Sequence, residues 1–137
     1  MGKRTKAREC ALQMLYQWDM TRDPMGRVVE SFWKVRSTTE ATREMAERLA
    51  WGASKECDAL DETITAASRN WRFERIAAID KNILRLAVYE IGHRDDIPSS
   101  VSVNEAVEIA KKYSTEDSGK FVNGILGSYL RQRQRPS

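Results

Sequence analysis

The chain has 137 residues, of which 41% are hydrophobic and 31% are charged, and its formal net charge is +3 at pH 7. These values predict one soluble globular domain, and they exclude a membrane protein because no stretch is long and apolar enough to cross a bilayer. The amphipathic pattern behind the basic first residues argues against a signal peptide. Cys10 and Cys57 have no CxxC spacing, which indicates reduced thiols in a cytoplasmic protein, with no disulfide and no zinc site.

The positive charge is concentrated at the two ends of the chain. The basic residues that precede the first acid are Lys3, Arg4, Lys6 and Arg8, and those near the C-terminus are Arg131, Arg133 and Arg135. Without these seven residues the chain carries a net charge of −4. This distribution is typical of a localised anion-binding surface, although charged ends can equally serve solubility alone.

Apolar residues at spacings of three and four predict a first helix over residues 7–18, ended by Asp23 and the proline that follows it. Several basic residues fall on its first turns, where positive charge opposes the helix dipole and a bound anion would relieve the cost. Tyr16 lies outside the apolar stripe, as either a half-buried packing residue or a partner contact. A short second helix is expected over residues 27–36.

Ser37 and Glu40 have the spacing of a capping box and predict the start of a long third helix that reaches Ile64. Residues 68–74 interrupt the helical pattern, so we expect a connector whose Trp71 and Phe73 pack against the core. This connector divides the single domain, residues 1–137, into helical halves of about 1–69 and 70–137.

The rest of the chain is expected to be organised around a helix at residues 75–91. Its apolar residues cover most of the circumference, which predicts a position in the middle of a helical bundle. One polar edge remains, where Lys81 and Arg85 are four residues apart on one face and Asp80 stands beside them. This edge is a candidate functional surface.

Residues 92–98 are expected to form a loop, because the proline that closes it disfavours helix in the residue before it. A second capping box at residues 102–105 predicts a helix that runs to about Tyr113. Residues 114–117 have the pattern of another helix start, with acids in the first turn. The last helix contains three glycines, which indicate the close approach of another helix or a ligand: Gly119, Gly124 and Gly127. No strand is predicted, and the fold class is therefore all-α.

The sequence contains no convincing catalytic or metal-binding motif. His93 is the single histidine and lies at a predicted helix end, and there is no HExxH, GxSxG or Cys/His cluster. Gly119 and Lys120 lack the other residues of a phosphate loop, and the adjacent acids Asp95 and Asp96 are typical of a solvated surface. The residues alone predict a helical binding protein without enzymatic activity, metal or cofactor, and with RNA or DNA as a plausible partner.

Three segments of the chain resemble the NusB family of bacterial transcription antitermination factors. They are residues 7–16, which begin AREC, residues 80–91, which contain LRLAVYE, and residues 96–124, which end in KFVNG. The resemblance spans almost the whole chain in order and is weakest between residues 20 and 70. It implies about seven helices in two sub-bundles and a protein that is not an enzyme.

The resemblance also implies a function. Proteins of this family bind the boxA element of ribosomal RNA leader transcripts as single-stranded RNA, in a heterodimer with NusE, a small-subunit ribosomal protein. The heterodimer helps to assemble the antitermination complex on RNA polymerase. A homodimer of the free protein stays open.

The resemblance assigns RNA contacts to the basic N-terminal motif and to the start of the last helix. Together with the polar edge of the central helix, they give the expected RNA-binding residues Lys3, Arg4, Lys6, Arg8, Lys81, Arg85, Asp117, Lys120 and Phe121. Aromatic stacking, cations and base-edge hydrogen bonds are the chemistry that holds single-stranded RNA, although Phe121 could equally belong to the core. Contacts with NusE are expected near Tyr16, Glu74 and Asp80. The two acids, Glu74 and Asp80, would meet a basic strip on the ribosomal protein.

Two other classes of protein stay open. A similar helical domain precedes the catalytic domain of certain ribosomal RNA cytosine methyltransferases, but the chain lacks the strand and glycine-rich loop of a methyl-donor site. The second class is a module that binds only protein, in which the basic ends serve solubility.

Overall fold

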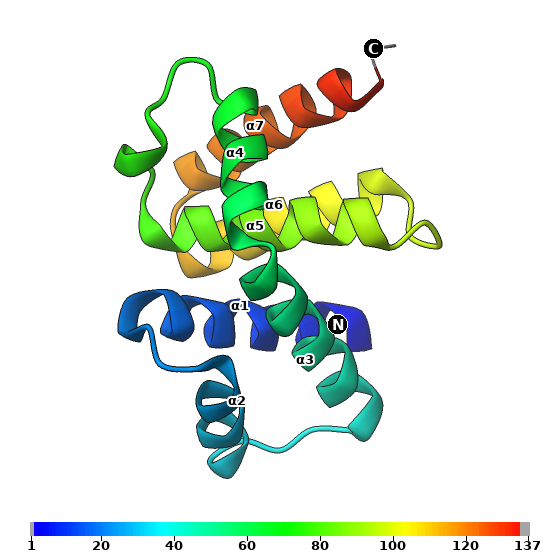
Figure 1. Ribbon diagram of the computed structural model, residues 1–137. Helices are drawn as coiled ribbons and strands as arrows, with labels where there is room; N and C mark the ends of the chain where they lie inside the picture. Colours follow the sequence, from blue (N-terminus) through cyan, green and yellow to red (C-terminus); the bar gives the residue numbers. More distant parts are fainter. Residues whose placement is uncertain (1, 135–137) are drawn as a thin grey trace. The chain divides into compact units, whose positions relative to one another are not determined.

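The computed structural model describes residues 2–134, and over this range the chain forms seven α-helices, one short 3-10 helix and no strand (Figure 1). The predicted all-α class is confirmed. The chain divides between Glu56 and Cys57 into two compact units. Within residues 2–134, none of the helices has the length and apolar character needed to cross a membrane. Arg135, one of the C-terminal basic residues, lies outside the described range.

The N-terminal unit consists of α1 (Lys3–Thr21), α2 (Met25–Lys34) and α3 (Glu40–Lys55). Helix α1 is its centre and packs against both of the others. The side chains that α1 buries repeat at helical spacing and include Ala7, Cys10, Ala11, Met14 and Leu15. The two helices predicted before residue 37 are therefore confirmed, and α1 begins early enough to carry the basic N-terminal residues on its first turns.

The start of α3 differs from the prediction. The N-cap is Thr39, whose Oγ1 accepts a hydrogen bond from the backbone N–H of Thr42 at 3.2 Å. Ser37 precedes the helix and takes no part in this cap. The capping-box prediction was wrong by two residues because one serine and two threonines stand in a row at residues 37–39, and the side chain that faces the free amides decides the start.

The predicted long third helix is two helices. Helix α3 ends at Lys55, and α4 (Cys57–Ala67) begins after Glu56. The backbone N–H of Glu56 still donates to the carbonyl of Gly52 at 3.1 Å, so the interruption between the two helices is a single residue. This break is also the boundary between the two units, whereas the sequence suggested a division in the connector at residues 68–74.

The C-terminal unit contains α4, the 3-10 helix η1 (Phe73–Arg75), α5 (Ala78–His93), α6 (Ser99–Tyr113) and α7 (Glu116–Gln134). Helix α5 contacts α4, α6 and α7 and is the centre of this unit. Its buried apolar side chains cover most of its circumference: Ile83, Leu84, Leu86, Ala87, Val88 and Ile91. Within this unit, the prediction of a central apolar helix is confirmed.

The starts of α6 and α7 test the remaining two capping predictions. Helix α6 begins at Ser99, directly after Pro98, and the predicted N-cap Ser102 is a buried residue inside the helix. Proline fixes a backbone angle that suits a helix start, so this earlier signal prevailed. Helix α7 begins as predicted, because the backbone N–H of Ser118 donates to Thr115 Oγ1 at 3.0 Å.

Two glycines of α7 have different surroundings. A Cβ atom at Gly119 would lie 2.9 Å from Cγ of Lys111, so α6 and α7 approach each other closely there, as the sequence suggested. A Cβ atom at Gly124 would meet nothing within 4 Å. The glycine at position 124 is therefore not required by helix packing.

Candidate nucleic-acid interface

The first turns of α1 carry exposed cations that no acid in that turn balances. Lys3, Arg4 and Lys6 are exposed, the first turn holds no acidic residue, and the N-cap Gly2 offers no side chain for a capping hydrogen bond. Because the positive end of the helix dipole lies there as well, an anion bound at these turns would be stabilised by both charge sources. Arg8, by contrast, is only 7% exposed and does not belong to this exposed cluster.

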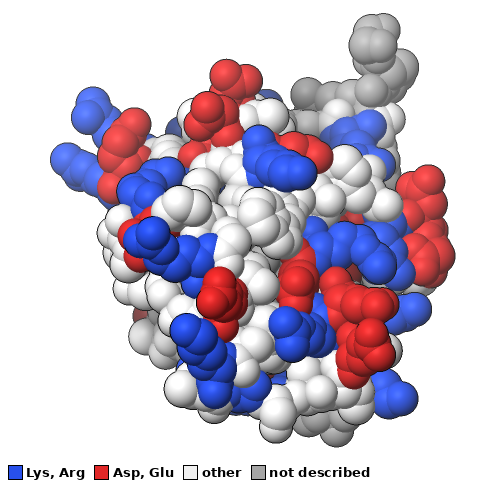
Figure 2. Space-filling model, turned by 60° about the horizontal axis from the view of Figure 1, so that its bottom comes forward, with Lys and Arg blue, Asp and Glu red and all other residues white. Residues whose placement is uncertain are grey.

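Charges of both signs are mixed on one face of the molecule (Figure 2). On the face drawn in Figure 2, lysine and arginine side chains are interspersed with aspartate and glutamate. A site for a polyanion must therefore be located by the side chains that gather at one place and not by a broad field of one sign.

Arg85 is a structural residue of the C-terminal unit. Its side chain is 4% exposed, and its Nε and Nη2 donate to the two carboxylate oxygens of Asp61 at 2.7 and 2.8 Å. Its Nη1 donates to Oδ1 of Asn82 at 2.9 Å. These bonds tie α5 to α4, and the structure removes Arg85 from the predicted RNA-binding set. Lys81 is half-buried, with its Nζ 4.7 Å from the ring centroid of Phe73, and stays a candidate.

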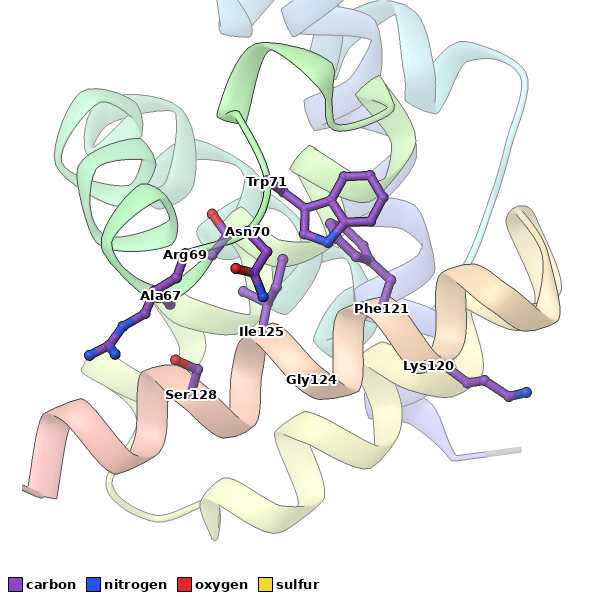
Figure 3. Close-up of a pocket in the computed structure, with 10 residues that line it drawn as sticks. Ala67, Arg69, Asn70, Trp71, Lys120, Phe121, Gly124, Ile125 and Ser128 are labelled. Atoms are coloured by element: carbon purple, nitrogen blue, oxygen red, sulfur yellow. The ribbon is translucent and has the colours of Figure 1, made fainter.

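An aromatic pair forms the most distinctive surface feature of the C-terminal unit. The ring centroids of Trp71, on the connector, and Phe121, on α7, are 5.3 Å apart, with 78° between the ring planes. Trp71 is 56% exposed, so the prediction that it packs into the core was wrong. Phe121 is half-buried and lies against Trp71 (Figure 3). Its burial is thus intermediate between that of a core residue and that of a fully exposed stacking platform.

Two recesses adjoin this pair. The first has a volume of about 350 Å³ and is bounded by the connector and α7 (Figure 3); its polar and aromatic lining residues are Ser68, Arg69, Asn70, Trp71, Lys120, Phe121 and Ser128. The second has a volume of about 290 Å³, and its lining includes Trp71, Arg75, Asp80, Thr115, Asp117 and Phe121. Three predicted residues therefore fall in this region: Phe121 belongs to the aromatic pair, Lys120 lines the first recess and Asp117 lines the second.

The connector supplies the residues that the sequence analysis missed. Trp71, Arg69 and Asn70 line the first recess, and Arg75 lines the second. The signal was present in residues 69–75, where three arginines alternate with two aromatic side chains. Basic residues interleaved with aromatic ones are the composition of single-strand binding surfaces, because they supply phosphate contacts and stacking faces together.

Asp80 lies on the second recess and not on an open surface. It is 6% exposed, and its Oδ2 accepts a hydrogen bond from Ser118 Oγ at 3.2 Å. Its Oδ1 is buried and has no hydrogen-bond partner among residues 2–134. Burial raises the pKa of Asp80, and the bond from Ser118 acts in the opposite direction. A partner would therefore reach this carboxyl only with a group that enters the recess.

The other two residues predicted to meet a protein partner are accessible. Tyr16 is exposed on α1, in the N-terminal unit, and Glu74 is exposed on η1, in the C-terminal unit. Neither is needed for the packing described above. Among residues 2–134, no group of three or more histidine, cysteine, aspartate or glutamate side chains could hold a metal ion.

These features define an all-helical binding protein whose exposed cations and aromatic rings suit a polyanion with planar groups. The family model described as the NusB family matches residues 5–131. The chain belongs to the NusB family, and the resemblance inferred from three sequence segments is confirmed.

Relatives and solved structures agree with this assignment. The chain is 44% identical to the transcription antitermination protein NusB of Methylacidiphilum infernorum over 136 residues, which covers 98% of this chain and 95% of the relative. It is 48% identical to the protein of the same name from Symbiobacterium thermophilum, with 93% and 89% covered.

Among solved structures, NusB of T. maritima is similar with a TM-score of 0.85 and 32% identity, covering 96% of this chain and 92% of that one. A crystal structure of the antitermination factors NusB and NusE in complex with dsRNA is similar with a TM-score of 0.84 and 26% identity, covering 96% and 98%.

Proposed function

We propose that this protein is a transcription antitermination factor that binds the boxA element of ribosomal RNA leader transcripts together with NusE, and that the complex joins the antitermination assembly on RNA polymerase. One observation carries the proposal: on the C-terminal unit of a NusB-family chain, Phe121 contacts an exposed tryptophan, and Lys120 and Asp117 line the two recesses that this tryptophan shares. The relative that was solved with NusE and dsRNA supports both partners.

The chemistry of this surface suits single-stranded RNA. Trp71 and Phe121 offer aromatic area to an unstacked base, and the exposed Lys120 offers a cation to the adjoining phosphate. Asp117 is exposed in the first turn of α7, where its carboxylate can accept a hydrogen bond from a base amino group. The exposed cations of α1, Lys3 and Arg4 among them, supply further phosphate contacts, which are independent of the RNA sequence.

The contact with NusE is proposed for Tyr16, Glu74 and Asp80. An aromatic side chain at an interface contributes apolar area and a hydroxyl, which makes Tyr16 a suitable anchor. Glu74 is accessible to a basic strip on the partner, and the buried carboxyl of Asp80 can accept from a donor that enters the second recess. The two acids thus differ in the depth at which a partner would meet them.

The test is a binding titration with a short boxA RNA and a scrambled RNA of the same length, with and without NusE, at two salt concentrations. We expect boxA to bind more tightly than the scrambled RNA, and NusE to strengthen that preference. In the double variant Arg4→Ala and Lys6→Ala, affinity should fall for both RNAs, and the salt dependence should decrease by roughly one unit for each lost phosphate contact.

A matched control for these cations is the double variant Arg27→Ala and Lys34→Ala, which removes two exposed cations from α2 in the same unit. It should leave the salt dependence unchanged. Equal affinity for boxA and the scrambled RNA, with no effect of NusE, would contradict the proposal and favour a module that binds only protein.

A further inference from the structure

We propose that the recess between residues 67–71 and α7 is a slot for one unpaired RNA base, and that Trp71 is the platform on which this base stacks. The inference rests on the proposed RNA-binding function and adds to it the ligand of one defined recess. Phe121, the aromatic residue expected from the sequence, then supports the platform from the side (Figure 3).

The exposure of Trp71 is the first argument. Tryptophan is highly buried on average in folded proteins, yet this side chain is 56% exposed beside a recess. Its contact with Phe121 is edge-to-face, at 5.3 Å and 78°, and such a contact leaves ring surface free for a stacked ligand. An exposed indole gains from burial under a planar base, because stacking covers apolar area that is otherwise in water.

The platform is held in place by its own backbone. The N–H of Trp71 donates to the carbonyl of Ser68 at 3.2 Å, and the buried Ser68 donates to the carbonyl of Ile64 through both its N–H, at 3.0 Å, and its Oγ, at 2.8 Å. Gln132 of α7 also donates to the carbonyl of Ala66, at 2.9 Å. The start of the connector is thus fastened to α4, and the last turn of α4 is bonded to α7, so binding a base needs little further ordering of the chain.

The wall formed by α7 is the second argument. Glycine is among the least favourable residues inside a helix, and Gly124 stands in the middle of α7. No neighbouring residue requires a glycine at this position, because a Cβ atom there would meet nothing within 4 Å. Gly124 does, however, line the recess. The absence of a side chain at Gly124 lets a flat ligand approach the helix backbone in the recess that Trp71 also lines.

The charge and size of the recess select the kind of ligand. Two of the ten described lining residues, Arg69 and Lys120, are basic and none is acidic; they lie toward opposite ends of the recess (Figure 3). These positions suit the phosphates on either side of a base, and they disfavour a basic peptide. The volume of about 350 Å³ is at the lower end for ligand pockets, as expected for a single base. The side-chain amide of Asn70 adds a donor and an acceptor for the edge of the base.

The decisive experiment pairs protein variants with abasic RNAs. Each nucleotide of the boxA RNA is replaced in turn by an abasic one, which removes the base and keeps the phosphate, and affinity is measured for wild type and Trp71→Ala. We expect Trp71→Ala to weaken binding of the intact RNA roughly 5- to 150-fold. For one of the abasic RNAs, the affinity for wild-type protein should fall by about the same factor. The affinity of Trp71→Ala for that abasic RNA should equal its affinity for the intact RNA. That non-additivity identifies the stacked base.

Gly124 provides an independent variant that should keep the fold, because a Cβ atom there meets no neighbour within 4 Å. Gly124→Ala should raise helix stability while narrowing the recess, so thermal stability should rise and RNA affinity should fall. Gly124→Leu should lower affinity further. The matched control is Gly127→Ala on the same helix, where a Cβ atom would meet only the mobile end of Arg131 at 3.4 Å and Gly127 does not line the recess. A second control, Trp51→Ala, removes an exposed tryptophan from the N-terminal unit.

If the RNA binds but every abasic position weakens wild type and Trp71→Ala by the same factor, the base slot is overturned and the RNA-binding function stands. Unchanged affinity in Gly124→Leu would overturn it in the same way. If no RNA binds to wild-type protein under any condition, both the function and the slot are overturned.

Discussion

The ion pair between Arg85 and Asp61 gives the most direct test of the packing in the C-terminal unit. Replacing Arg85 by Ala removes a guanidinium that is 4% exposed and leaves behind a carboxylate that is 24% exposed. It also takes a donor from Asn82, which is fully buried. We expect this variant to lose stability, and the folded protein to keep its RNA affinity.

The structure sets the magnitude. Breaking a buried ion pair by removing one partner costs about 3–5 kcal/mol, because the remaining charge is left without compensation. The partial exposure of Asp61 allows water to replace the guanidinium, which favours the lower end of this range. The loss of this hydrogen bond to Asn82 acts in the other direction, since a hydrogen bond from a charged donor contributes about 1.5–3 kcal/mol. We therefore expect a loss of about 3–4 kcal/mol.

The assay is urea unfolding followed by far-ultraviolet circular dichroism. With a denaturant dependence of about 2 kcal/mol per molar urea, the midpoint should fall by roughly 1.5–2 M. The control is Arg43→Ala, which breaks a surface ion pair with Glu47 of 2.8 Å, where the arginine side chain is 52% exposed. Surface pairs contribute about 0–1 kcal/mol, so the midpoint should change by less than about 0.5 M.

A double variant separates the ion pair from the volume of the side chain. Arg85→Met combined with Asp61→Leu replaces the charged pair by apolar groups of similar size and should recover most of the lost stability. The reasoning would be refuted by a loss below about 1 kcal/mol in Arg85→Ala. A stable Arg85→Ala variant with weakened RNA binding would return Arg85 to the RNA-binding residues.

Three further predictions concern the two recesses and the partner surface. Phe121→Ala should weaken RNA binding by about 1–3 kcal/mol. Because the ring is half-buried, the variant should lose only about 1–2 kcal/mol of stability. A loss of about 3–5 kcal/mol in urea unfolding would instead identify Phe121 as a core residue. The folded state holds the proton of Asp80 more tightly than the unfolded state does, so stability should fall as the pH rises above 3.8 toward the raised pKa of Asp80. In melting temperatures measured from pH 3.5 to 7, Asp80→Asn should make this fall less steep. A pH profile that is the same for the variant and the wild type would contradict the raised pKa. Glu74→Lys should weaken NusE binding without loss of stability. Glu62 is another exposed acid of the same unit, and Glu62→Lys should leave NusE binding unchanged. Equal pull-down of NusE by both variants would place the contact elsewhere.

Features that depend on local spacing could be predicted from the sequence. The helical class, the course of α1 and α5, and the start of α7 within residues 114–117 follow from apolar periodicity and from side chains that act within one turn. The same rules misplaced the starts of α3 and α6. In both segments more than one residue carries a start signal, and spacing alone does not tell which one acts: Thr39 caps α3, and Pro98 precedes α6.

The candidate site was less accessible to such reasoning, because its chemistry depends on residues that are far apart in the chain. Arg85 has the sequence position of a surface cation, four residues after Lys81, and only its partner Asp61, 24 residues earlier, makes it a buried structural group. Asp80 likewise has the position of an exposed acid in a first helical turn, yet Ser118 of α7 closes over it. Trp71 shows the reverse case: an apolar side chain that burial rules assign to the interior lies 56% exposed.

The close approach at Gly119 has a consequence for how this chain can change during evolution. Any residue with a Cβ atom at position 119 would collide with Cγ of Lys111, which is near the backbone and cannot swing aside as the tip of the side chain can. A substitution at 119 is therefore tolerated most easily together with a smaller or differently oriented side chain at 111. Across homologous chains the two positions should vary together, as a coupled pair eight residues apart that joins α6 to α7.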